Sequence, residues 1–301
     1  MGLRGRAAAL AAVVLVAAAA AQAAPGPYAY DQGAPLAFRD AGRVNGKYPI
    51  AIHDVSYALE GRRVPAYLAL PPGKARVPAV IFLHGAGEDR RRFLLPAGWV
   101  AGRDAVGMTL TLPSTPAGDG PKGLTPSQSL ARAKTIFVRD VVAVRRAVDL
   151  LRTLPQVDPN RIGLVGWSLG ARVGAVLAGV EPRFGAVVLM SGGASPISDF
   201  VNQAPAGLRP AIRQNLTPID PLLWIHRARP GEILLQDGRK DQVVPKSALL
   251  ALAHAAPKGT TLRWYPTDHS LNSQAYRDQL AFLVRKLDIR GPNVPGADTG
   301  P

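Results

Sequence analysis

The sequence predicts an α/β fold in which a mostly parallel sheet is covered by helices on both faces. From residue 50 to residue 287, apolar runs typical of strands alternate with helical patterns. The run Pro78–Leu83 is apolar throughout, which indicates a strand buried on both faces. Another strand-like run leads directly into Gly166-Trp167-Ser168-Leu169-Gly170, and an Ala/Leu/Val-rich helix follows. In such a sheet, ligands bind outside the carboxyl ends of the strands.

The N-terminus has the pattern of a secretory signal peptide. Arg4 and Arg6 precede an apolar run, and Ala21-Gln22-Ala23 matches an A-x-A cleavage site. The run has about 15 residues, whereas a membrane span needs about 20. We therefore expect residues 1–24 to be a cleaved signal peptide, with an uncleaved anchor as the alternative, and no integral membrane segment after cleavage. The mature protein is then secreted, periplasmic or otherwise in the cell envelope.

Composition excludes several kinds of site. The chain has no cysteine, which rules out disulfides, thiolate metal sites, a cysteine nucleophile and a lipoprotein anchor. Its net charge of +15 could attract nucleic acid or an anionic surface. However, the arginines are spread over the chain and aromatic residues make up only 6%, so no nucleic-acid partner is expected. The local cluster Arg90-Arg91-Arg92 is interpreted as a solvated helix start, with a contact to an anionic substrate or surface as the alternative.

The elements follow in chain order. Residues 25–48, rich in Pro, Gly and Ala, are expected to cross the surface as a leader segment. Runs 50–57 and 64–70 predict a hairpin, and Pro65 suggests that its second strand lies near an edge or bulge. The first half then continues with strand 78–83, helix 91–101, strand 107–112 and a Pro/Gly/Ser/Thr-rich loop at 113–126.

The second half begins with the longest helix, 127–154, which has a broad apolar stripe. A less regular insertion at 195–230 is too short for a large lid. The remaining predicted elements are strand 161–165, the helix from 171, strand 185–190, strand 232–236, helix 246–255, strand 260–265 and helix 274–287. We interpret residues 49–287 as one catalytic domain and residues 288–301 as a flexible tail.

Ser168 lies where a backbone can make a serine nucleophilic. A serine on a tight strand-to-helix turn is held exposed in a strained conformation, and flanking glycines let neighbouring elements approach closely. Its hydroxyl needs a base, and that base needs an orienting partner. His269 is the candidate base, because it follows the last predicted strand and precedes the last helix. His254 falls inside a predicted helix and His53 in an edge strand, so both are expected to be structural or solvated.

The orienting acid should follow the strand between the serine and the histidine. Asp241 lies in a loop between that strand and a helix that begins at a proline, and it is the favoured candidate. Asp237 is its rival, although it is better suited to a turn. Asp268 adjoins His269, but neighbouring side chains diverge, which makes it the weaker candidate.

Two backbone amides are candidates for an oxyanion hole. The Leu169 N–H lies at a helix N-terminus, where donors and the helix dipole favour developing negative charge. The Ala86 N–H follows an apolar strand that stops at His84-Gly85. His84 is then expected to brace this turn rather than to act as a base.

The strand followed by HGAG, the stretch VDPNRIGLVGWSLGA, the stretch LLQDGRKDQVVP and the late histidine resemble the α/β-hydrolase superfamily over residues 50–287. Within it, they are most similar to dienelactone hydrolase-like and prolyl-oligopeptidase-type catalytic domains, including acetyl xylan esterase-like enzymes. The resemblance implies an eight-stranded sheet, a Ser168-Asp241-His269 triad, no cofactor, and hydrolysis of an ester, amide or thioester. The sequence departs from the pattern in having serine where dienelactone hydrolases have cysteine, no propeller domain, and Asp268 before the histidine.

We therefore expect a secreted serine hydrolase, a carboxylesterase that acts on a small-molecule or polysaccharide-linked ester. A peptidase or thioesterase with the same triad, a catalytically silent binding protein and an envelope or nucleic-acid binder are the alternatives. Residues 113–126 and 195–230 are expected to shape the pocket. Trp167 and Trp224 are candidate substrate-binding residues, and Trp167 is equally suited to core packing.

Overall fold

The computed structural model describes residues 26–44, 50–115 and 121–290. The predicted signal peptide, most of the predicted C-terminal tail and residues 116–120 of the predicted active-site loop therefore lie outside the described residues. Within the described ranges, no helix is both long enough and apolar enough to cross a membrane.

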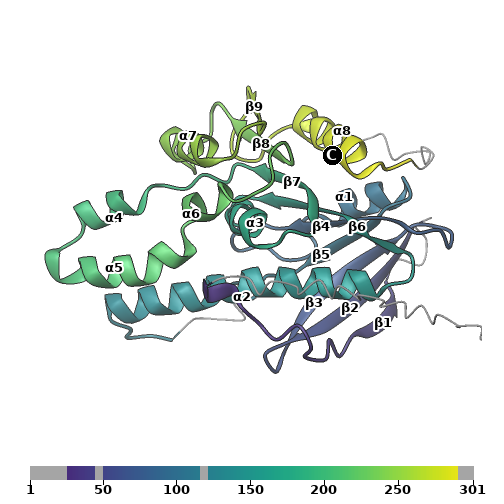
Figure 1. Cartoon of the computed structure of the whole chain (residues 1–301), viewed down its shortest axis with the longest axis horizontal. Coiled ribbons are helices and arrows are strands. Elements are labelled where there is room, and N and C mark those ends of the chain that lie inside the picture. Colours follow the sequence, from purple (N-terminus) through teal and green to yellow (C-terminus); the bar gives the residue numbers. More distant parts are fainter. Residues whose placement is uncertain (1–25, 45–49, 116–120, 291–301) are drawn as a thin grey trace, which may run out of the picture.

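One mixed sheet organises the described chain (Figure 1). Its strand order is β1-β2-β3-β5-β4-β6-β7-β8-β9. Strands β4 to β9 run in one direction, whereas β1, β2 and β3 are joined to the sheet by antiparallel pairings. The strands are β1 (Arg39–Arg43), β2 (Ala51–Leu59), β3 (Arg62–Leu70), β4 (Val77–Leu83), β5 (Val106–Leu110), β6 (Val157–Trp167), β7 (Phe184–Met190), β8 (Ile233–Gly238) and β9 (Thr261–Tyr265).

Helices cover both faces of this sheet. The α-helices are α1 (Leu94–Ala101), α2 (Pro126–Thr153), α3 (Leu169–Val180), α4 (Ile197–Gln203), α5 (Arg209–Leu216), α6 (Pro221–Ile225), α7 (Lys246–Ala255) and α8 (Ser273–Leu287). Three 3₁₀ turns are η1 (Gly26–Tyr28), η2 (Ala206–Leu208) and η3 (Thr217–Ile219). The longest helix, α2, begins at a capping box, in which the Thr125 side chain accepts from the Gln128 N–H and the Gln128 side chain accepts from the Thr125 N–H.

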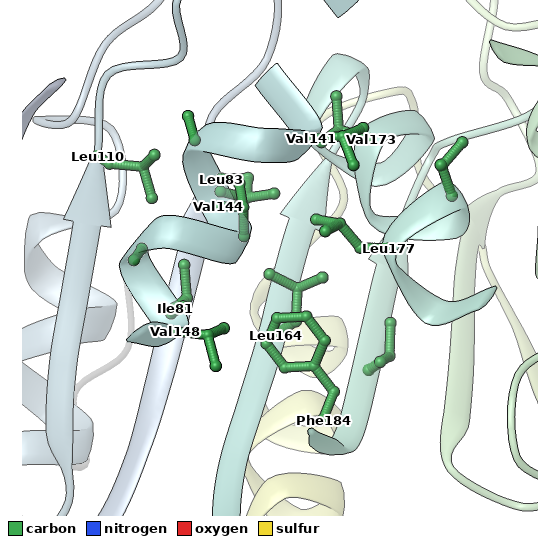
Figure 2. Close-up of a cluster of buried hydrophobic side chains, with 14 of the residues drawn as sticks. Ile81, Leu83, Leu110, Val141, Val144, Val148, Leu164, Val173, Leu177 and Phe184 are labelled. Atoms are coloured by element: carbon green, nitrogen blue, oxygen red, sulfur yellow. The ribbon is translucent and has the colours of Figure 1, made fainter. Parts of the chain in front are cut away.

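The two faces of the sheet form separate hydrophobic cores. All seven residues of β4 are buried, and they alternate between the cores: Ile81 lies under α2 and α3, and Phe82 lies under α1 and α8. Figure 2 shows the first core, in which Val144 of α2 and Leu177 of α3 meet side chains of the central strands. The sequence prediction of an α/β fold with helices on both faces is thus confirmed.

The sheet has nine strands in the described chain, one more than predicted. The additional strand is β1, which lies within the predicted leader segment and pairs with β2. Its sequence, Arg-Asp-Ala-Gly-Arg, has no apolar alternation, because an exposed edge strand buries little surface. The start of that segment is anchored to the domain through Tyr28. Tyr28 is fully buried, its carbonyl accepts from Arg145 of α2, and its hydroxyl donates to the Pro218 carbonyl.

The expectation for Pro65 is wrong, since β3 lies between β2 and β5 in the sheet interior. The carbonyl of Pro65 accepts from the Thr111 N–H, just past the last residue pair of β3 and β5. The nitrogen and the carbonyl of a strand residue face the same neighbour, so the Pro65 nitrogen also faces β5. The missing N–H therefore costs only the return bond to Thr111 at the end of the ladder and leaves its interior intact.

The insertion at 195–230 is more regular than predicted, because it contains α4, α5 and α6. Each is only five to eight residues long, and Pro196, Pro210 and Pro221 lie at or near their N-termini. These helices pack against the main domain, α5 on α2 and α6 on α3. Figure 1 shows α4 and α5 at one end of the molecule, beside the first turns of α2.

Candidate active site

Ser168 forms the turn between β6 and α3, where it is the N-cap of the helix. Its φ of 55° and ψ of −113° are rare for a residue with a side chain. The turn is held from both sides, because the Ser168 N–H donates to the Met190 carbonyl (2.9 Å) and the Gly170 N–H donates to the His84 carbonyl (3.1 Å). The strained turn that the motif predicts is present, whereas Ser168 is half-buried instead of exposed.

Both glycines of the motif are required by close backbone approach. A Cβ on Gly166 would overlap the carbonyl of Gly170, and a Cβ on Gly170 would overlap the carbonyl of Leu83 in β4. Any larger residue at either position would push α3 away from the strand ends. The spacing of the motif therefore sets how close Ser168 lies to the sheet.

Asp241 and His269 form a hydrogen-bonded pair at the carboxyl ends of β8 and β9. Oδ2 of Asp241 lies 2.8 Å from Nδ1 of His269, and the Asp241 side chain is only 1% exposed. Its other oxygen, Oδ1, accepts the backbone N–H groups of Val243 (2.8 Å) and Val244 (2.9 Å). The carboxylate is thus fixed at both oxygens, and one of them orients the imidazole.

The main chain of His269 is anchored beside the serine. Its carbonyl accepts hydrogen bonds from the Trp167 indole (2.9 Å) and from the Ser191 hydroxyl (3.0 Å). The Trp167 and His269 rings also lie 5.1 Å apart, centroid to centroid. Since Trp167 immediately precedes Ser168, these contacts bring His269 to the nucleophile turn. No Ser168–His269 hydrogen bond is present among the described residues, and such bonds are often long before substrate binds.

Neither rival carboxylate contacts His269 in the described chain. Asp237 is buried at the end of β8, and burial, followed by the nearby charge of Asp241, raises its pKa to about 7. Asp268 accepts the Ser270 N–H in a local turn. Of the three acidic candidates from the sequence, the structure pairs only Asp241 with the histidine.

The two predicted oxyanion donors come from separate elements. Leu169 is the first residue of α3, and Ala86 lies in a turn closed by the Glu88 N–H on the Gly85 carbonyl (3.4 Å). Within the described ranges, neither the Leu169 nor the Ala86 N–H donates to another protein atom. Glu88 Oε2 accepts the Gly85 N–H (3.1 Å) and so stabilises the same turn. We call residues 85–88 the oxyanion turn.

His84 braces this turn, as the sequence predicts. The Leu112 N–H donates to Nε2 of His84 (3.0 Å), so the proton lies on Nδ1, which donates to the Gly85 carbonyl (2.7 Å). Burial lowers the pKa of His84, which favours this neutral form. The ring therefore links the oxyanion turn to the loop that begins after β5, and both of its nitrogens are hydrogen-bonded.

The two tryptophans have different positions. Trp167 lies at the site, with its indole on His269 and the Arg92 guanidinium 4.7 Å from its ring. Trp224 is buried in the core, edge-on to Tyr28, and its carbonyl lies against Gly179 near the far end of α3. Ten residues of helix, about 15 Å, separate that contact from Leu169. The structure thus does not bring Trp224 to Ser168, because its ring is needed to fill the space between α6 and the N-terminal segment.

Ser191 and Glu88 are contributors that the sequence analysis did not single out. Ser191 directly follows β7 and has a positive φ of 50°, like Ser168 one strand away. A polar residue at the carboxyl end of a buried strand is the signal that could have identified it. Among the described residues, no group of three or more His, Asp and Glu side chains could hold a metal ion.

The arginine cluster precedes the helix instead of forming its start, because α1 begins at Leu94. Each arginine has a carboxylate partner. Arg90 pairs with Asp54 (2.6 Å), Arg91 with Asp89 (2.5 Å) and Arg92 with Glu88 (3.5 Å).

Comparison with known proteins agrees with this architecture. A model of the alpha/beta hydrolase family matches residues 80–290, a range that contains the motif serine, Asp241 and His269. Two acetyl xylan esterases are similar in structure, both with a TM-score of 0.70 and 18% identity. The one from Thermoanaerobacterium sp. is matched over 83% of this chain and 88% of its own, and the one from Paenibacillus sp. R4 over 84% and 90%.

A candidate dienelactone hydrolase from Klebsiella pneumoniae is also similar, with a TM-score of 0.61 and 16% identity over 80% of this chain and 99% of its own. At these identities, the structural likeness shows a shared fold. The residues at the carboxyl ends of the strands must carry any argument about chemistry.

Proposed function

Because the chain belongs to the alpha/beta hydrolase family, we propose that it is a serine esterase with Ser168 as nucleophile, His269 as base and Asp241 as the orienting acid. The observation that carries this proposal is the Asp241–His269 hydrogen bond, formed beside a serine in a strained strand-to-helix turn. The acetyl xylan esterases of the same fold support an ester substrate.

In the proposed acylation step, His269 takes the hydroxyl proton of Ser168 as the oxygen attacks the ester carbonyl. Asp241 keeps the proton of Nδ1 directed toward itself, so Nε2 is free to accept. The tetrahedral oxyanion is held by the Leu169 and Ala86 amides, and each such donor is typically worth roughly 3–4 kcal/mol of barrier. The imidazolium then protonates the leaving alcohol.

Deacylation repeats the same roles with water as the nucleophile. His269 removes a proton from the water, the oxyanion forms again between the two amides, and the Ser168 oxygen leaves with the proton from the imidazolium. Trp167 and Ser191 would act as positioning residues, because they hold the main chain of His269.

The site of action follows from the N-terminal sequence. We propose that residues 1–24 direct export and that the mature enzyme acts outside the inner membrane, secreted or in the cell envelope. A small-molecule ester or an ester carried on a polysaccharide fits that location.

Fluorophosphonate labelling of the mature protein, beside Ser168→Ala, tests the proposal. We expect labelling of the wild type alone, together with hydrolysis of p-nitrophenyl acetate that the variant loses by several orders of magnitude. Parallel assays with an acyl thioester and a peptide p-nitroanilide decide the bond type. Faster turnover of either one would replace the esterase assignment with thioesterase or peptidase. A folded wild type that neither labels nor turns over any of these substrates would favour a binding role.

A further inference from the structure

We propose that a basic groove beside the oxyanion turn holds an extended anionic part of the substrate, a chain that carries carboxylate groups. The inference rests on the proposed function. The groove consists of two hollows of about 400 and 420 Å³. Both hollows are lined by Pro65, Thr111 and Thr115, so they are two parts of one surface feature.

The first hollow lies between the β2–β3 hairpin and α2. Arg62 and Arg63 enter it from the start of β3. Arg132, Ile136 and Arg139 enter it from α2, where spacings of four and three residues place them on one helix face. Buried Leu59, Val64 and Leu112 form part of its floor.

The charge of the groove is strongly positive. Six arginines line the two hollows and only two carboxylates do, and Arg90 is also paired with Asp54, which leaves an excess of three positive charges. The carboxylates are Glu60, which pairs with Arg139 (3.2 Å), and Asp89, which pairs with Arg91. The arginines are Arg62, Arg63, Arg90, Arg91, Arg132 and Arg139.

The side chains of two of these arginines have no partner among the described residues. Arg62 and Arg132 are exposed, and neither side chain forms an ion pair or a hydrogen bond with another described residue. A guanidinium presents a planar fork of donors that matches a carboxylate, so a ligand can satisfy both. The other arginines are held in place; Arg63, for example, donates to the carbonyls of Ala37 and Ser56.

The groove borders the oxyanion turn. Its second hollow is lined by Asp89, the residue after the oxyanion turn. Thr115, shared by both hollows, donates its hydroxyl to the Glu88 carbonyl (3.0 Å), and Leu112 in the floor donates its N–H to His84. A chain lying in the groove would therefore end beside the oxyanion turn, whose Ala86 N–H is the proposed oxyanion donor. Two connected hollows suit an extended ligand better than a single small ion.

The chemistry of the groove favours an acidic polysaccharide over a nucleic acid. Single-stranded nucleic acids bind through basic grooves that also offer aromatic rings for base stacking. The single aromatic residue lining the two hollows is Tyr67, and the Arg90 guanidinium covers its ring at 3.9 Å. Charge is thus available to a ligand here, and a stacking surface is not.

Binding can be tested separately from catalysis in the Ser168→Ala background. The probe is polygalacturonate, with uncharged dextran as its neutral counterpart, measured by calorimetry at low salt. We expect R62Q/R132Q to weaken polygalacturonate binding about tenfold and R62K/R132K to weaken it at most about threefold. The matched control K258Q/R285Q removes two exposed charges, one from the turn before edge strand β9 and one from α8, which lies on the sheet face opposite to α2. This control should change binding by less than about twofold.

Catalysis supplies the second readout, in the active enzyme. R62Q/R132Q should lower kcat/KM for acetylated polygalacturonate about tenfold and leave turnover of acetylated dextran and p-nitrophenyl acetate unchanged. Four results would each overturn the inference. Two concern binding: R62Q/R132Q binds polygalacturonate as tightly as before, or K258Q/R285Q loses as much affinity as R62Q/R132Q. The others are an equal loss of kcat/KM on both acetylated polymers, and binding of single-stranded DNA that is tighter than binding of polygalacturonate. Absence of all ester hydrolysis with the binding pattern intact would refute the proposed function and leave the groove as an anion site.

Discussion

Replacement of Asp241 by Asn should place the imidazole proton on the wrong nitrogen. In the structure, Oδ1 of Asp241 accepts two backbone N–H groups, from Val243 and Val244, while Oδ2 faces Nδ1 of His269. The amide oxygen of Asn must take the place of Oδ1, because an NH₂ group there would face two donors. The NH₂ group then faces Nδ1, which must accept. The proton consequently moves to Nε2, which can no longer take a proton from Ser168.

The magnitude follows from the loss of the base. In the best-studied serine hydrolase triad, the equivalent change lowers kcat about 10⁴-fold, which corresponds to about 5.5 kcal/mol of barrier. We expect Asp241→Asn to have the same effect, with little change in KM. The fold should persist, since both backbone hydrogen bonds to Oδ1 are retained.

Asp237→Asn is the matched control. It makes the same chemical change four residues earlier, at a buried carboxyl that has no hydrogen bond to His269. We expect kcat to stay within about threefold of the wild type. The assay is steady-state hydrolysis of p-nitrophenyl acetate, with melting temperatures to confirm folding. The reasoning is refuted if Asp241→Asn retains more than about a tenth of the wild-type kcat, or if Asp237→Asn loses as much.

Four further changes test separate parts of the structure. Ser168→Gly should be inactive but more stable than Ser168→Ala by about 1 kcal/mol, because glycine adopts the positive φ of this turn without strain; equal urea midpoints would contradict this. Trp224→Ala should cost about 3–5 kcal/mol of stability and leave the kcat of the folded fraction unchanged, so a selective rise in KM would return Trp224 to the substrate site. Ser191→Ala should lower kcat about fivefold and leave KM unchanged, through loss of one hydrogen bond to the His269 carbonyl; wild-type kinetics would exclude a positioning role. Burial raises the pKa of Asp140 to about 7, so the folded state binds more protons than the unfolded state between about pH 4 and 7. The stability that this proton uptake contributes is lost as pH rises through that range. Asp140→Asn should therefore flatten the fall in the free energy of unfolding that urea titrations measure between about pH 4 and 7.

The sequence predicted best where a residue pattern has a single physical explanation. The GWSLG motif required a tight strand-to-helix turn, and the structure has it, with both glycines in close backbone contact. The loop position of Asp241 favours it over Asp237, and Asp241 is the one that contacts His269.

Prediction failed where tertiary contacts decide the structure. Strand β1 has no apolar pattern, so only its pairing with β2 defines it. Helices α4 to α6 are too short to show a clear period, and they depend on packing against α2 and α3. Trp224 looked available for substrate because its burial depends on Tyr28, almost 200 residues earlier in the chain.

The two edges of the sheet differ in how they would receive a strand from another molecule. At one edge, β1 consists mainly of charged residues and glycine, and its register with β2 shifts between Asp40 and Arg43. Charge and an irregular ladder both discourage pairing with a foreign strand, so this edge protects against aggregation. At the opposite edge, β9 is regular along its five pairs with β8 and exposes Leu262. If concentrated protein associates through its sheet, the contact should form at β9, and a charged residue in place of Leu262 should improve solubility more than any change in β1.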